Sequence, residues 1–141
     1  KESGNGEDIP RVAEIKISLS KDGQAARDFV KESSGNRILN MYRSGYSHED
    51  IQRLGVDLED ADQLNQAEEP GASAAEFDDL VTDDMVDAIF IAGTPGDCLE
   101  RMIEVQDTAR KQGFHQLMYS ELGPDIDEAL GLLCDEIIPA L

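Results

Sequence analysis

Three positions along the chain carry residues whose types and spacing could form a ligand-binding site. Gly93, Thr94 and Gly96 fall where an apolar run ends and a helical pattern begins. A glycine lets the backbone turn closely, and free N–H groups at a helix start, together with the helix dipole, favour an anion such as a phosphate. The same stretch also starts a helix well, with Pro95 at the first position and Asp97 two residues later. Because the carboxylate of Asp97 opposes an anion, helix capping is the preferred interpretation and a phosphate contact is the alternative.

Lys16 and Glu121 are the other two candidates for a binding site. Lys16 alternates with apolar residues, so it is expected on one face of a strand, where it could bind a phosphate or carboxylate at the mouth of a barrel. A surface lysine paired with Glu14 fits the pattern equally well. Glu121 follows another predicted strand, Phe114–Tyr119, and lies beside Gly123 and Pro124, where a carboxylate could meet a substrate. A solvated loop carboxylate is the alternative there.

Such residues need strands and helices that bring them to one edge of a sheet. Alternating residues predict a strand at Val12–Leu19, a continuous apolar run predicts a buried strand at Ala88–Ala92, and a third strand is expected at Phe114–Tyr119. A helical pattern follows each strand, from about Gly23 to Ser33 after the first and from Asp125 after the last. This alternation is typical of parallel βα units.

The chain is interpreted as one α/β domain, residues 1–141. Residues 1–10 are polar and are expected to be a linker, and residues 36–80 are expected to be a helical insert. Three βα units fit the closing part of a (β/α)8 TIM barrel, strands six to eight, with the strands adjacent in chain order. An open doubly wound sheet is the alternative, and in both architectures ligands bind at the carboxyl ends of the strands.

Three parallel strands cannot close a barrel, so we expect this chain to be an incomplete catalyst. A strand that is apolar throughout requires neighbours on both faces. The expected partners are therefore the N-terminal part of the same barrel or a second copy of the chain in a homo-oligomer. The catalytic residues are expected in that N-terminal part.

Charge and composition exclude several classes of partner. Asp and Glu number 31 against 12 Lys and Arg, a formal charge of -19, which argues against nucleic acid and against anionic membranes. No apolar run has the length of a membrane span. Cys98 and Cys134 lack metal-ligand spacing, so no metal site is expected. Two small buried cysteines in a reducing cytoplasm are the interpretation.

The same segments also resemble a known family. "VTDDMVDAIFIAGTPGDCLERM", "GFHQLMYSELGPDIDEAL" and "EIIPAL" resemble the C-terminal part of the bacterial luciferase-like flavin- and deazaflavin-dependent oxidoreductases. Within that superfamily the resemblance is to the methylenetetrahydromethanopterin reductases, which use coenzyme F420. It implies a luciferase-like TIM barrel that transfers a hydride between coenzyme F420 and a methylene-tetrahydropterin substrate.

The resemblance also assigns roles to the candidate residues. Gly93, Thr94 and Gly96 would bind the cofactor, while Lys16 and Glu121 would line the substrate site. "EIKIS" resembles a strand of F420-dependent sugar-phosphate dehydrogenases, in which a lysine at the position of Lys16 contacts the substrate phosphate. Such a dehydrogenase, or an FMN-dependent monooxygenase, is one alternative function, and a noncatalytic acidic binding module is another.

The acidic residues are spread along the chain, and this distribution yields a first prediction. Spread acids favour a halophilic protein, whose self-repulsion salt screens, over an acidic interaction surface. Molar KCl should therefore raise the melting temperature above its value in dilute buffer. A melting temperature that KCl leaves unchanged or lowers would favour the acidic interaction surface.

Overall fold

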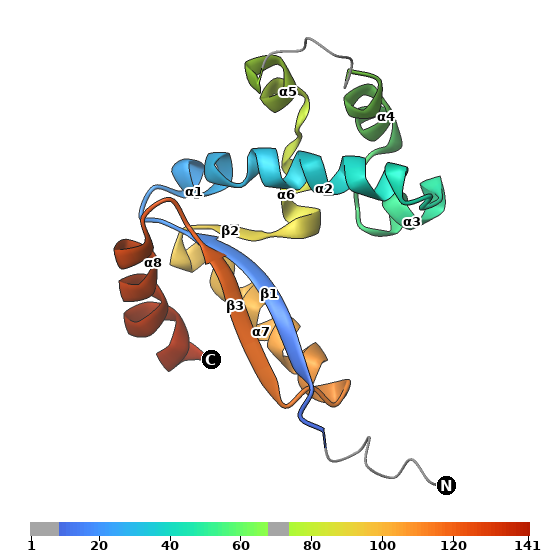
Figure 1. Ribbon diagram of the computed structural model, residues 1–141. Coiled ribbons are helices and arrows are strands. Elements are labelled where there is room, and N and C mark those ends of the chain that lie inside the picture. Colours follow the sequence, from blue (N-terminus) through green and yellow to red (C-terminus); the bar gives the residue numbers. More distant parts are fainter. Residues whose placement is uncertain (1–8, 68–73) are drawn as a thin grey trace, which may run out of the picture.

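The computed structural model describes residues 9–67 and 74–141, so most of the expected linker at residues 1–10 lies outside the described residues. The described part contains one parallel sheet of three strands: β1 (Val12–Leu19), β2 (Ile91–Gly93) and β3 (Gln116–Leu122). An α/β fold with parallel strands is thus confirmed. The loop from β1 to α1 and the loop from β3 to α8 lie side by side at the carboxyl ends of the strands (Figure 1).

Helices make up most of the rest of the described chain. A first group lies between β1 and β2, and α7 and α8 follow β2 and β3. The bounds are α1 (Gly23–Phe29), α2 (Lys31–Arg43), α3 (His48–Arg53), α4 (Leu58–Ala67), α5 (Ala74–Leu80), α6 (Asp83–Ile89), α7 (Pro95–Lys111) and α8 (Ile126–Leu132), with a π turn (Leu133–Ile137) and a 3-10 turn (Ile138–Ala140) closing the chain.

The order of the strands differs from the prediction. We expected β1, β2 and β3 side by side in chain order, but the observed order is β2-β1-β3, with β1 in the centre. The lengths of the strands account for this order. β3 pairs with β1 at seven positions, from Val12–Gln116 to Ser18–Leu122, whereas β2 pairs at three, from Ile17–Ile91 to Leu19–Gly93. The long strands thus satisfy most of each other's backbone hydrogen bonds.

Some predicted boundaries were also wrong. Ala88 belongs to α6, because the apolar run continues the helix capped by Thr82, and the strand begins only at Ile91. The third strand starts two residues later than predicted and reaches Leu122. The helix expected to reach Ser33 ends at Phe29, and α2 begins two residues later. Apolar residues alone do not distinguish a buried helix from a buried strand, and the cap decides here.

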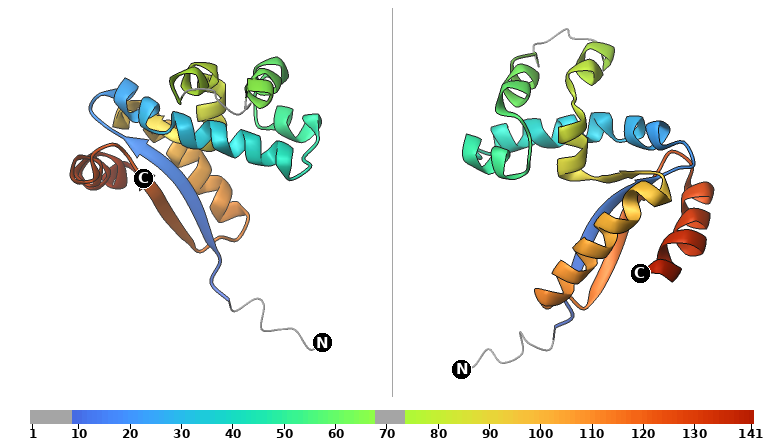
Figure 2. Two further views of the ribbon diagram at one scale, coloured as in Figure 1. Left: turned by 45° about the horizontal axis from the view of Figure 1, so that its top comes forward. Right: turned by 180° about the vertical axis from the view of Figure 1, so that it is seen from behind.

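The described residues form two hydrophobic cores. One joins α2 to α6 and includes Ile38, Leu64 and Met85, all fully buried. The other lies between the sheet and the pair α7 and α8, and includes Ile17 and Ile137. Figures 1 and 2 show the first group as a helical layer over the strand ends, and α7 against one face of the sheet.

The opposite face of the sheet has no helix over it among the described residues. In Figure 1, β1 and β3 lie in front of α7, with their other face toward the viewer. Val12 and Met118 are 48% and 50% exposed on that face. Alternation along β1 places Glu14 and Lys16 there too, because Ala13 and Ile15 face α7. In the expected barrel, this open face would line the interior.

A close backbone contact fixes where β3 leaves the sheet. Gly123 has a positive φ of 145°, and a Cβ at this residue would lie 2.4 Å from the carbonyl oxygen of Leu19. A glycine is therefore required for the chain to pass the end of β1.

This contact predicts a loss of stability in Gly123→Ala. A Cβ would force the backbone of β1 and β3 apart and leave an L-residue at strained φ, so we expect about 2 kcal/mol of lost unfolding free energy in a urea titration. Gly131→Ala is the matched control. No atom lies within 4 Å of its Cβ position, in the helix α8, and alanine there should stabilise by about 0.5–1 kcal/mol. Equal stability of Gly123→Ala and the wild type would contradict the close contact.

Candidate functional site

The structure brings the carboxyl ends of the strands together, as predicted. The backbone N–H of Ser20, after β1, donates to the carbonyl of Gly93 at the end of β2, at 3.3 Å. The hydroxyl of Ser20 donates to Glu128 Oε2 at 2.8 Å, and the N–H of Lys21 reaches the same oxygen at 3.3 Å. Glu128 lies in the first turn of α8, so one carboxylate ties the end of β1 to the helix after β3.

The Gly93–Gly96 turn holds a helix cap made by its own residues. The hydroxyl of Thr94 donates to Asp97 Oδ2 at 2.7 Å, the backbone N–H of Thr94 donates to the same oxygen at 3.0 Å, and Asp97 N–H donates back at 3.3 Å. These hydrogen bonds hold the pKa of Asp97 below its ordinary value. The preferred interpretation, helix capping, is confirmed, and a cofactor contact of this turn stays a prediction.

Gly93 shapes this turn through its backbone. Its φ is 151°, and an added Cβ would lie 3.1 Å from the side chain of Asp97. The glycine thus gives the capping carboxylate its room. The carboxylate occupies the position at the helix start that an anion would take.

Lys16 and Glu121, predicted independently, meet in space. Lys16 Nζ lies 3.3 Å from Glu121 Oε1 and 3.8 Å from Glu14 Oε1. The ammonium also lies 5.9 Å from the centre of the Phe90 ring, close enough for a cation–π contact. Glu14 in turn accepts a hydrogen bond from the Ser120 hydroxyl at 2.7 Å. Sequence reasoning had proposed the Glu14 contact as the alternative to a binding role, and both neighbours are present.

The backbone of β3 turns Glu121 toward Lys16. Leu117 and Tyr119 line a pocket beside α7, so regular alternation would place Glu121 on that helix side as well. Instead Glu121 has a φ of 75° and Leu122 one of 67°. The N–H of Gly123 donates to the carbonyl of Glu121 at 2.9 Å, a γ-turn with positive φ at its centre, which is a strained conformation.

Sequence reasoning missed Ser20, Glu128 and Phe90. Glu128 falls in the first turn of α8, and periodicity places a residue on a helix but does not show what its side chain reaches. Ser20 directly follows β1, and this position at a strand's carboxyl end was the available signal. Phe90 directly precedes β2, at its amino end, where that signal does not apply.

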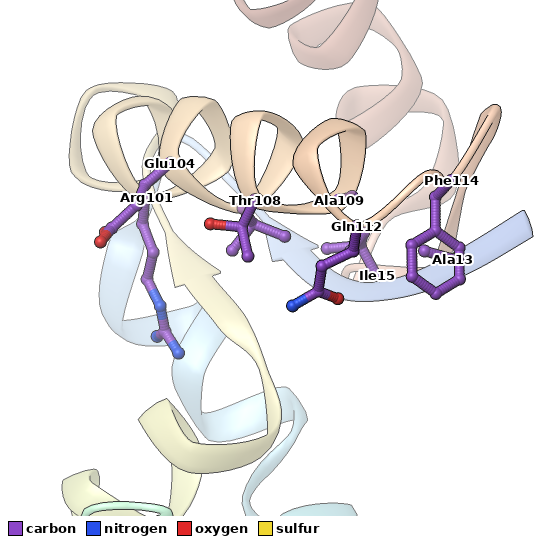
Figure 3. A pocket seen from close by; sticks show the side chains of 9 residues that line it. Ala13, Ile15, Arg101, Glu104, Thr108, Ala109, Gln112 and Phe114 are labelled. Carbon is purple, nitrogen blue, oxygen red and sulfur yellow. The ribbon is translucent and has the colours of Figure 1, made fainter.

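A separate cavity lies on the helix side of the sheet (Figure 3). It has a volume of about 470 Å³ between α7 and the first half of β1, with Ala13, Ile15 and Phe114 among its apolar lining and Arg101 at one end. It arises where β2, three residues long, leaves the first half of β1 without a neighbour on that side. It is distant from the strand carboxyl ends and shares no residue with the predicted site.

The two cysteines differ in their surroundings. Cys98 is buried, and burial raises the pKa of its thiol to about 11, so it is not a thiolate nucleophile. Cys134 is exposed, which corrects the prediction that both are buried. Within residues 9–67 and 74–141, no group of three or more His, Cys, Asp or Glu is arranged to hold a metal ion. Of the helices described, none is both long and apolar enough to cross a membrane.

The sequence of the chain was compared with those of known proteins. No family model matches the chain. The chain is 30% identical over 123 residues to 5,10-methylenetetrahydromethanopterin reductase of Methanolobus tindarius and 30% over 138 residues to that of Archaeoglobus fulgidus. These alignments cover 86% and 92% of this chain, and 35% and 38% of the relatives. The chain is related to the methylenetetrahydromethanopterin reductases. The predicted resemblance is thereby confirmed.

A solved structure agrees with these relatives. The coenzyme F420-dependent tetrahydromethanopterin reductase of Methanopyrus kandleri superposes with a TM-score of 0.72 at 28% identity, covering 94% of this chain and 36% of that chain. The fold prediction, part of a luciferase-like barrel, is confirmed at this level. The chain spans a little over a third of the length of the reductases that it matches.

The capping box yields a prediction for stability and for its pH dependence. Thr94→Ala should cost about 1 kcal/mol of unfolding free energy at pH 7, because a cap is lost. Thr108→Ala, an exposed site in the same helix, is the matched control and should cost far less. The lowered pKa of Asp97 means that its contribution is complete above its unfolded pKa, 3.8, and disappears as the pH falls through the folded value.

Asp97→Asn should therefore be less stable than the wild type at pH 7, and the difference should shrink as the pH falls below 3.8 and through the lower folded pKa of Asp97. Urea titrations from pH 2 to pH 7 measure this difference. A difference that stays constant with pH would show that the Asp97 carboxylate contributes nothing through its charge.

Proposed function

We propose that this chain is the C-terminal part of an F420-dependent oxidoreductase that transfers a hydride between coenzyme F420 and a methylene-tetrahydropterin. The observation that carries the proposal is the agreement of sequence and structure. The chain superposes on the F420-dependent reductase over 94% of its length, and sequence alignments with reductases named for this substrate cover 86% and 92% of it. The proposal also places the protein in the cytoplasm, as a homo-oligomer.

The residues of this chain would position the two reactants. Coenzyme F420, when bound, supplies the hydride chemistry. Gly93, Thr94 and Gly96 lie at the carboxyl end of β2 and the start of α7, where they would contact the cofactor. Lys16 and Glu121 lie on the open face of the sheet and would hold the substrate. A further part of the same barrel would supply the catalytic residues and would cover the open face, excluding water.

An exchange experiment tests this proposal. The matched part of the Methanopyrus kandleri reductase is replaced by residues 9–141 of this chain, and the purified chimera is mixed with reduced coenzyme F420 and the methylene-pterin substrate. We expect oxidation of the coenzyme, followed by its absorbance, because the matched parts share one fold.

The parent reductase and the same reductase lacking the matched part are the positive and negative controls. A chimera with the parent's circular dichroism spectrum that binds coenzyme F420 but transfers no hydride would overturn the proposal. If the chimera does not fold, a second experiment replaces it. This chain is added, as a separate polypeptide, to the reductase lacking the matched part, and the activity of the mixture is measured. Absence of activity in that mixture also counts against the proposal.

A further inference from the structure

We propose that Lys16 and Glu121 act together as a specificity pair that binds an uncharged ring edge with donors beside an acceptor and rejects phosphate. This inference rests on the proposed function, since the ring edge it fits is the 2-amino-4-oxo edge of a pterin. It differs from the role implied by the resemblance to the sugar-phosphate dehydrogenases, in which a lysine at the position of Lys16 contacts the substrate phosphate.

The charges around the ammonium carry the first step. Lys16 Nζ lies 3.3 Å from the Glu121 carboxylate and 3.8 Å from that of Glu14, so two carboxylates face one cation. The local charge is negative by one, within a chain whose formal charge is -19. An incoming phosphate would have to break the pair and approach two like charges, which is unfavourable.

The backbone carries the second step. Glu121 reaches Lys16 only because its φ is 75° and the next residue forms the centre of a γ-turn. A strained turn that moves one carboxylate from the helix side of the sheet to the open side is a costly way to make a half-exposed ion pair. Strain of this kind is found where a side chain must be aimed at a ligand.

Chemical complementarity carries the third step. A carboxylate accepts hydrogen bonds, and an ammonium only donates them. The pair therefore offers an acceptor beside a donor, which matches the amino and ring N–H donors and the oxo acceptor of a pterin edge. Met118, paired with Glu14 on the neighbouring strand, lies half-exposed on the same face and offers apolar contact to a flat ring.

Nuclear magnetic resonance titration of the chain tests the proposal with two probes, 6-methylpterin and inorganic phosphate. In the wild type we expect 6-methylpterin, and not phosphate, to shift the amide resonances of Lys16 and Glu121 in a saturable manner. Glu121→Gln keeps the shape of the side chain and removes its charge. It should weaken pterin binding by about tenfold, the value of one charged hydrogen bond, and should let phosphate shift Lys16.

Glu14→Gln is the matched control, because it removes a carboxylate 3.8 Å from the same ammonium and leaves the pair intact. It should keep the wild-type pterin affinity. The proposal is overturned if phosphate shifts Lys16 in the wild type, if 6-methylpterin does not, or if Glu14→Gln weakens pterin binding as much as Glu121→Gln does.

The titration contains no coenzyme, so it separates this inference from the proposed function. If the chimera transfers no hydride while the wild-type chain still discriminates between the probes, the proposed reaction is wrong and the proposed role of the specificity pair is retained. If the chimera is active and its Glu121→Gln variant keeps the KM for the pterin substrate, the proposed role of the pair is wrong and the proposed reaction is retained.

Discussion

The parallel pairing of β1 with a strand on each side is the interaction on which the rest of the structure depends. β1 gives its first seven residues to β3 and its last three to β2, and this places both neighbours' carboxyl ends beside its own. The chain closes this edge tightly. Gly123 passes within reach of the Leu19 carbonyl, and Glu128 binds Ser20, so α8 is tied to the end of β1. Each predicted site residue owes its position to this edge.

The two faces of the sheet have different roles as a consequence. Helices α7 and α8 bury Ile17 and its neighbours on one face, where burial stabilises the fold. The other face keeps a lysine, two glutamates and half-exposed apolar residues without a helix over it in the described part of the chain. In a complete barrel such a face would line the interior at the mouth of the barrel. This location explains why charged side chains occur on the central strand of the sheet.

The relation to the reductases gives these details a context. A match over 94% of this chain and 36% of the solved reductase means that the two proteins share the region that carries these strand ends. Within that region the ion pair of Lys16 and Glu121 is a property of this chain's own geometry. Thr94 and Asp97, in contrast, serve the start of α7, and any contact with a cofactor would add to that structural role.

The sequence by itself determined the elements whose signals are local. Alternation predicted β1, and the Thr94 box predicted the start of α7, because side-chain period and capping act over a few residues. It also identified Lys16 as a candidate from its alternation with apolar residues, and Glu121 from its place after a strand. Only the tertiary structure decided that β1 is central and that the two side chains meet. Strand order depends on which long strands pair, and the Glu121 carboxylate depends on a left-handed backbone that no residue type there specifies.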